Sequence, residues 1–158
     1  MLFIKNAILA GGLALGLAMP VSAFSQTAVS RDLATEEANR QLVVAFHDGV
    51  FNKHDIAGYI GVMVDDYRQH NPMLPDGKAV LVDYLIKFFA DNPDSSARIV
   101  RSAADGDLVW LHLHTKLNKD DPGQASLDIF RVTDGKIVEH WDVNQPVPEK
   151  SANTNTMF

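Results

Sequence analysis

A change in hydrophobic periodicity near residue 95 constrains the fold most strongly. Before it, segments 35–51 and 78–93 place apolar side chains three and four residues apart, which is typical of amphipathic helices. After it, four runs alternate as strands do, separated by the turn sequences DGD, NKDDPG and TDG. These runs cover residues 96–104, 107–117, 124–132 and 136–145. Helices followed by an antiparallel meander predict an α+β domain with helices packed on one face of a curved sheet.

Three details of the helical half are also expected. The first helix should begin behind a Thr35 cap, because acidic residues occupy its first turn. A shorter helical segment is predicted over residues 55–64. The following stretch, 65–77, should be irregular because it contains two prolines and a glycine.

The N-terminal residues resemble a targeting signal and not part of a fold. Lys5 precedes an apolar run over residues 6–20, and small residues stand at Val21 and Ala23. This pattern predicts a secretory signal peptide, residues 1–23, cleaved after Ala23, and therefore a periplasmic or secreted protein. An uncleaved membrane anchor is the alternative, but the run is shorter than the ~20 residues that span a bilayer and is interrupted by glycines and Pro20. No membrane contact is expected after cleavage.

Length and composition allow one folded domain after the signal peptide. The predicted organisation is a flexible leader at 24–34, the domain at 35–147 and a C-terminal tail at 148–158. With no cysteine, the domain must be stable without disulfides. The net charge of −6 and the lack of a basic cluster exclude a nucleic-acid surface. We expect the partners to be a small-molecule substrate and a second copy of the chain.

Strand alternation groups the candidate site residues, since alternate side chains share a face. One face of the strand-like runs holds imidazoles, carboxylates and large aromatic groups together, a mixture typical of a half-apolar ligand pocket. The alternative is a solvated sheet face, which the period alone does not exclude. The residues assigned to the pocket face are Trp110, His112, His114, Ser126, Asp128, Phe130, Val138, His140, Asp142 and Asn144, with Trp141 on the opposite face.

The histidines carry most of the expected chemistry. His112 and His114, together with His70, His140 or an aspartate, would suit a divalent metal, but a lone His-x-His pair is a weak signal. We instead expect these histidines to carry protons or to form hydrogen-bonding walls of the pocket, and we expect no bound metal. His70 precedes Asn71-Pro72, so its ring is expected over the pocket mouth. His47 and His54 are assigned to the helix surface or to helix capping, outside the site.

Three segments resemble a known family. "DIFRVTDGKIVEHWDVNQPVPE", residues 128–149, resembles the SnoaL-like polyketide cyclase branch of the nuclear transport factor 2-like superfamily. "QHNPMLPDGK" and "NTNTMF" are similar to its predicted aldol-condensation-catalysing subgroup. The resemblance implies a cone-shaped α+β barrel, with helices on a strongly bent, mostly antiparallel sheet that encloses a pocket, and often a homodimer formed through the outer sheet face.

The resemblance also implies a mechanism without metal or cofactor, in which an aspartate on the last strands is the acid/base. Asp142 matches that position, whereas Asp128 stands where the cyclases have a histidine. We therefore hypothesise that Asp142, with a pKa raised by burial and a neighbouring carboxylate, is the base. One of His140, His112 and His70 would donate to the enolate oxygen, and Asp128 would orient an imidazole. Trp110, His114, Phe130, Asn71 and Asn144 are the expected substrate-binding residues.

The function predicted on this basis is cofactor-independent acid/base chemistry next to a carbonyl, of the aldol, cyclase, isomerase or lyase type. Two alternatives stay open. One is a non-catalytic exported protein that binds a small amphipathic ligand. The other is a metal-dependent lyase or hydrolase that uses His112 and His114.

Overall fold

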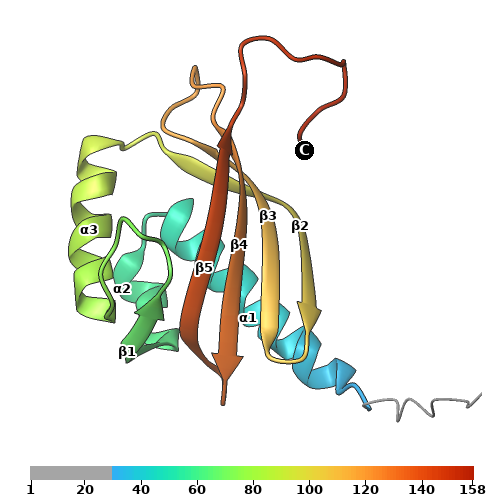
Figure 1. Cartoon of the computed structure of the whole chain (residues 1–158). Coiled ribbons are helices and arrows are strands. Elements are labelled where there is room, and N and C mark those ends of the chain that lie inside the picture. The colour runs from blue at the N-terminus through green and yellow to red at the C-terminus, as the bar shows by residue number, and fades with distance from the viewer. Residues whose placement is uncertain (1–29) are drawn as a thin grey trace, which may run out of the picture. The chain divides into compact units, whose positions relative to one another are not determined.

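The structure, a computed structural model, describes residues 30–158 and has α+β architecture (Figure 1). The predicted signal peptide, its cleavage site and residues 24–29 of the leader lie outside the described residues. The helices are α1 (Leu33–Phe51), α2 (Ile56–Tyr59) and α3 (Lys78–Asp91), and a 3-10 turn, η1, covers Ile60–Val62. The strands are β1 (Met63–Gln69), β2 (Ser96–Asp105), β3 (Leu108–Lys116), β4 (Gln124–Thr133) and β5 (Lys136–Pro146).

The five strands form one mixed sheet in the order β1-β5-β4-β3-β2. The pairs β2–β3, β3–β4 and β4–β5 are antiparallel, and only β1 runs parallel to its neighbour β5. Helix α1 crosses one face of this sheet, and α3 lies beyond the β1 edge (Figure 1). The predicted α+β fold, with helices packed on a bent and mostly antiparallel sheet, is confirmed.

The hairpin between β4 and β5 turns at Asp134-Gly135, as its sequence predicts. Both residues have positive φ, 49° and 68°, which a two-residue hairpin of type I′ requires. Beyond the turn Val132 pairs with Ile137 and Arg131 with Glu139, so Val138 is the extra residue of a bulge in β5. The bulge places Ile137 and His140, three residues apart, on the same inner face of the sheet. The prediction that Val138 faces the pocket is therefore wrong, because strict alternation does not continue through a bulge.

The N-cap of helix α1 lies three residues earlier than the sequence indicated. Asp32, not Thr35, is the N-cap, and its Oδ1 accepts a hydrogen bond from the backbone N–H of Thr35 at 3.1 Å. The buried face of α1 includes Val43, Phe46 and Val50, which pack into the core against the sheet.

Strand β1 was not expected from the sequence, which predicted helix and then an irregular stretch. Its run "MVDDYRQ" has adjacent aspartates and a break in register between Met63 and Arg68, so its buried positions do not alternate regularly. Met63 and Tyr67 nevertheless face the core, each only 2% exposed. This strand matters for the site because it and the turn after it deliver Gln69 and Asn71.

The hydrophobic core lies between the inner sheet face and the helices. On β3 the inward side chains are aliphatic, and Val109, Leu111 and Leu113 are almost completely buried. From α3, Leu81, Leu85 and Phe89 complete this core. None of the helices within residues 30–158 is both long and apolar enough to span a bilayer.

Candidate active site

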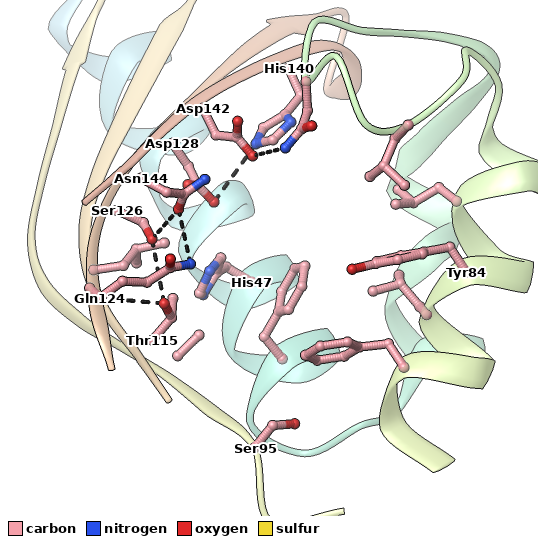
Figure 2. Close-up of a pocket in the computed structure, with 18 of the residues that line it drawn as sticks. His47, Tyr84, Ser95, Thr115, Gln124, Ser126, Asp128, His140, Asp142 and Asn144 are labelled. Carbon is pink, nitrogen blue, oxygen red and sulfur yellow. Dashed lines mark hydrogen bonds and ion pairs between the residues drawn. The ribbon is translucent and has the colours of Figure 1, made fainter. Parts of the chain in front are cut away.

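A cavity of about 470 Å³ lies between the inner face of the sheet and helices α1 and α3. Its size falls within the usual range for small-molecule sites. One wall is apolar and comes from the helices: Phe46, Phe51, Leu81, Leu85, Phe88 and Phe89. The facing wall is polar and comes from β4 and β5: Ser126, Asp128, His140, Asp142 and Asn144 (Figure 2).

The register of the β4–β5 hairpin gathers the polar wall. Asp128 lies directly opposite Asp142, and Ser126 lies opposite Asn144. Phe130 pairs with His140 in the same way, and their rings are 4.7 Å apart. The structure thus places these residues on one face, as predicted, but a tight hairpin alone does not explain it. The one-residue register shift near the turn is also needed, because without it Asp128 would lie opposite Trp141.

The β3 residues predicted for the same face lie on the other one. Leu111, not His112, is opposite Asp128, and His112 pairs with Leu127. Trp110, His112 and His114 therefore point to the outer face of the sheet, and none of them lines the cavity. The prediction failed because alternation only shows which residues of one strand share a face. Which face of the sheet they occupy depends on the register with the neighbouring strand, and a shift of one residue moves every side chain of the strand to the other face.

On the outer face, both β3 histidines already have partners. Nδ1 of His112 accepts a hydrogen bond from Arg101 at 3.0 Å, and Nε2 of His114 is 2.9 Å from the carbonyl oxygen of Pro122. The C-terminal residue Phe158 stacks on His114 with ring centres 4.0 Å apart. This arrangement contradicts the metal-dependent alternative built on His112 and His114.

His70 also lies outside the cavity and not over its mouth. Its ring stacks on Trp141 at 4.5 Å, and its Nε2 is 2.7 Å from Oε1 of Glu139. Since neighbouring strand residues point to opposite sides, the residues on either side of His70, Gln69 and Asn71, line the cavity instead. Asn71 was predicted for the site, and Gln69 was not.

Gln69 fixes the tautomer of His140. Its Oε1 accepts a hydrogen bond from the backbone N–H of Asn71 at 2.9 Å, so this atom is the amide oxygen. The same oxygen is 3.0 Å from Nδ1 of His140, which must therefore carry a proton and donate it. In the neutral ring Nε2 then holds the lone pair, and it lies 3.7 Å from Oδ2 of Asp128.

Asn71 orients Asp142 in a similar way. Its Oδ1 accepts from the backbone N–H of Met73 at 2.8 Å, and its Nδ2 donates to Oδ2 of Asp142 at 2.7 Å. One carboxylate oxygen of Asp142 is thus held in place, and the other is left for a bound molecule. The hypothesis had Asp128 orienting an imidazole, but here the amide of Gln69 does so, and Asp128 stands across a gap longer than a hydrogen bond.

Two further cavity residues were missed. Tyr67 is buried, and its hydroxyl accepts a hydrogen bond from Nε2 of Gln69 at 3.0 Å. Burial, followed by the charges of Asp128 and Asp142, raises the pKa of Tyr67, so its phenol stays protonated. The second missed residue is His47, which was assigned to the helix surface or to a cap. The helical spacing places it on the same buried face of α1 as Val43, Phe46 and Val50, so the sequence contained a signal for it.

That second residue, His47, lies on α1 and lines the cavity opposite the sheet (Figure 2). It is 1% exposed, and its ring stacks on Phe51 with centres 4.8 Å apart. Burial is the main reason that the pKa of His47 is lowered from 6.5 to about 4. The imidazole is therefore neutral at neutral pH.

A neutral polar patch extends the site along the same face. Oδ1 of Asn144 accepts hydrogen bonds from Oγ of Ser126 at 2.5 Å and from Nε2 of Gln124 at 3.2 Å (Figure 2). Because both bonds use the amide oxygen, the amide N–H groups of Asn144 are left to donate to a bound molecule.

The polar wall has the ligand types for a cation as well as for proton transfer. Asp128, His140 and Asp142 each offer an atom within 4.8 Å of the others. Two carboxylates and an imidazole lone pair would suit a divalent ion. This group, and not His112 with His114, is where the described residues could hold a metal.

Comparison with known proteins places the chain in a family. Residues 43–140 match the SnoaL-like domain. A SnoaL-like protein of unknown function from Burkholderia thailandensis superposes with a TM-score of 0.61 at 18% identity, covering 70% of this chain and 96% of that one. A proposed ketosteroid isomerase from Kribbella flavida gives 0.59 at 20% identity, with 75% and 85% covered.

A proposed SnoaL-like polyketide cyclase from Jannaschia gives a TM-score of 0.57 at 17% identity, covering 69% of this chain and 86% of that one. At such identities these structures share the fold with this chain, and no match was found among curated proteins. The match to the family model covers more than half of the chain. The chain therefore belongs to the SnoaL-like domain family.

Proposed function

We propose that this protein is an enzyme that moves a proton at a carbon next to a carbonyl, without metal or cofactor, in a reaction of the aldol, cyclase, isomerase or lyase type. One observation carries the proposal: Asp142, Asp128 and His140 meet on the polar wall of a cavity whose facing wall is apolar. Neighbouring amides fix the imidazole ring of His140 and the carboxylate of Asp142. Such preorganisation is what proton transfer requires.

Asp142 and His140 have different roles in the proposed proton transfers. Asp142, through the oxygen not bound by Asn71, removes the α-proton of the substrate, and the electron pair of the C–H bond forms the enolate. His140 in its protonated form donates from Nε2 to the enolate oxygen, while Nδ1 stays bonded to Gln69. The negative charge of Asp128, 3.7 Å away, attracts the imidazolium.

The second half of the reaction depends on the substrate. In an isomerisation, the protonated Asp142 returns the proton to another carbon of the conjugated enol, and His140 takes back the enol O–H proton as the carbonyl re-forms. In an aldol closure, the enol carbon attacks a second carbonyl of the same molecule, His140 accepts the enol proton again, and Asp142 protonates the new alkoxide. Both routes restore the starting charges of the site.

The cavity walls support an amphipathic carbonyl compound as substrate. Aromatic and aliphatic side chains of α1 and α3 would cover its apolar body, and the sheet wall would meet its oxygen atoms. Similarity in fold to a proposed isomerase and a proposed cyclase agrees with this class. The predicted signal peptide further suggests a periplasmic or secreted enzyme that meets a diffusible compound.

We also propose a homodimer formed through the outer sheet face. That face exposes Leu127 and Val143, which are 40% and 64% accessible in the single chain. Light scattering of the mature protein should give twice the chain mass. Replacing Val143 by Lys should return it to the mass of one chain.

The test of the proposed chemistry is exchange of α-protons in deuterated water. 2-Tetralone, a bicyclic ketone, would be incubated with the mature protein, and loss of its α-proton signals followed by NMR. We expect exchange faster than in buffer, and a fall of about 10²-fold or more in Asp142→Asn. His112→Asn on the outer face is the matched control and should exchange at the rate of the wild type. Equal rates in Asp142→Asn and the wild type would refute the role of Asp142.

A non-catalytic binding protein is the second candidate. The observation that favours it is the large apolar wall, which would bind an amphipathic molecule whatever the polar wall does. In that case 2-tetralone binds but no α-proton exchanges above the rate in buffer. Asp142→Asn then changes affinity alone.

A further inference from the structure

His47 is the one histidine whose environment the proposed mechanism does not explain. It lies near the C-terminal end of α1, its ring stacks on Phe51, and it is 1% exposed. Asp128 and His140 are near enough to influence its pKa electrostatically. His47 therefore faces the reacting groups from the opposite side of the cavity (Figure 2).

The ring of His47 lacks the hydrogen bonds that the other five histidines make. In those five, one ring nitrogen lies within hydrogen-bond distance of a protein partner: Gln69 for His140, Glu139 for His70, Ser95 for His54, Arg101 for His112 and Pro122 for His114. Nδ1 of His47 is buried and has no partner among the described residues. A polar atom left so in a core costs about 1–3 kcal/mol, so it calls for a reason.

The tautomer of His47 follows from this orphaned atom. A neutral imidazole has one N–H donor and one lone pair. Among backbone groups, buried donors without partners are rarer than under-satisfied acceptors, and by the same preference we assign the proton to Nε2 and the lone pair to Nδ1. Since Nδ1 is enclosed and the residue lines the cavity, the ring presents its Nε2–H side to the bound molecule.

We propose that His47 is a ligand-binding residue whose Nε2–H donates a hydrogen bond to an oxygen atom of the bound molecule, across the cavity from Asp142. The ligand is then held from both sides: an oxygen substituent meets α1, and the reacting carbon meets the sheet. The inference rests on the proposed function only where it identifies that oxygen as the carbonyl or enolate oxygen.

The tautomer can be tested without any ligand. In protein labelled with ¹⁵N-histidine, long-range ¹H–¹⁵N correlation at pH 7 distinguishes the two neutral forms. The signal lost in His47→Phe identifies the residue. We expect the Nε2–H form, and the Nδ1–H form or a charged ring would overturn the proposal.

The hydrogen bond itself can be tested with two probes of the same shape, 2-naphthol and naphthalene. His47→Phe keeps an aromatic ring beside Phe51 but has no donor. It should weaken 2-naphthol about tenfold, which corresponds to one hydrogen bond, and leave naphthalene unchanged. His47→Gln retains an N–H donor and should recover part of the loss.

An equal effect on both probes, or none on 2-naphthol, would overturn the proposal, and so would failure of 2-naphthol to bind the wild type. These measurements need no turnover. If 2-tetralone does not exchange while 2-naphthol binding depends on His47, the proposed chemistry fails and the binding role of His47 stands. The reverse pattern refutes His47 alone.

Discussion

Both faces of the sheet carry histidines, but the surroundings of these histidines differ between the faces. The outer face carries His70, His112 and His114 with two tryptophans, and each of these histidines is hydrogen-bonded and stacked on, or within 6.0 Å of, another aromatic ring. The inner face carries His140 with two aspartates, and His47 stands across from it. There the polar atoms point at an open cavity and at one another. Residue type alone therefore does not identify the site, whereas the cavity that these side chains line does.

The largest contrast should come from exchanging a carboxylate for an amide on each face of β5. Asp142→Asn on the inner face should lower α-proton exchange by about 10²-fold or more while the fold is kept. Glu139→Gln on the outer face should leave the exchange rate unchanged, although it weakens bonds to His70 and Arg131. NMR exchange rates and thermal unfolding of both variants measure this difference. Loss of exchange in Glu139→Gln would mean that the two faces do not separate as described.

The next contrast concerns acid stability. The folded pKa of His47, about 4, lies below the unfolded value of 6.5, so the unfolded chain binds more protons between these pH values. Its contribution to stability is complete above pH 6.5 and declines as the pH falls toward 4. From pH 7 to pH 5 the loss should be about 2 kcal/mol.

Denaturant titrations at the two pH values would measure that loss. Asp128, Asp48 and His140 are the charged or titratable neighbours that influence His47, so the comparison must be made against His47→Phe, in which this part of the pH dependence should vanish. The outer-face variant His114→Phe should keep it. If the free energy of unfolding depended on pH equally in His47→Phe and the wild type, the effect assigned to burial of His47 would be contradicted.

A third contrast concerns metal. Asp128, His140 and Asp142 could bind a divalent ion, but the proposed proton transfers do not need one. Exchange of 2-tetralone should therefore change by less than about twofold after dialysis against a chelator. Elemental analysis before and after dialysis is the necessary control. Loss of exchange on dialysis, restored by Zn²⁺ or Mn²⁺, would assign the inner group to metal chemistry instead.

The smallest effect is expected at the C-terminus. Phe158 stacks on His114 and lies 6.0 Å from the ring of His112, all on the outer face. Phe158→Ala should cost about 1 kcal/mol of stability or less and leave exchange untouched. Differential scanning calorimetry with the exchange assay checks both. A large loss of exchange would show that the tail serves the inner site.

Periodicity was sufficient to predict α1, α3 and the hairpins, because these depend on short-range patterns. The grouping of Asp128 with Asp142 was also predicted, but their direct pairing depends on a bulge that the alternation does not contain. The faces of β3 were not predictable, since they depend on its register with β4, and nothing local to "LVWLHLHTK" records that register. Strand β1 was hidden by its charges and its register break. His47 was within reach, because the spacing of the buried residues in α1 includes it.

The chain of hydrogen bonds from Asn71 through Gln69 to His140 has a consequence for how this protein can evolve. The position of the His140 proton is set by the orientation of one side-chain amide on the edge strand, whereas the apolar wall of the cavity comes from α1 and α3. Gln69→Glu, a single-base change, would keep an acceptor for His140 and lose the donor to Tyr67. Selection can thus adjust reactivity and ligand preference through separate sets of residues, a division that would let one scaffold acquire new reactions without first losing its binding.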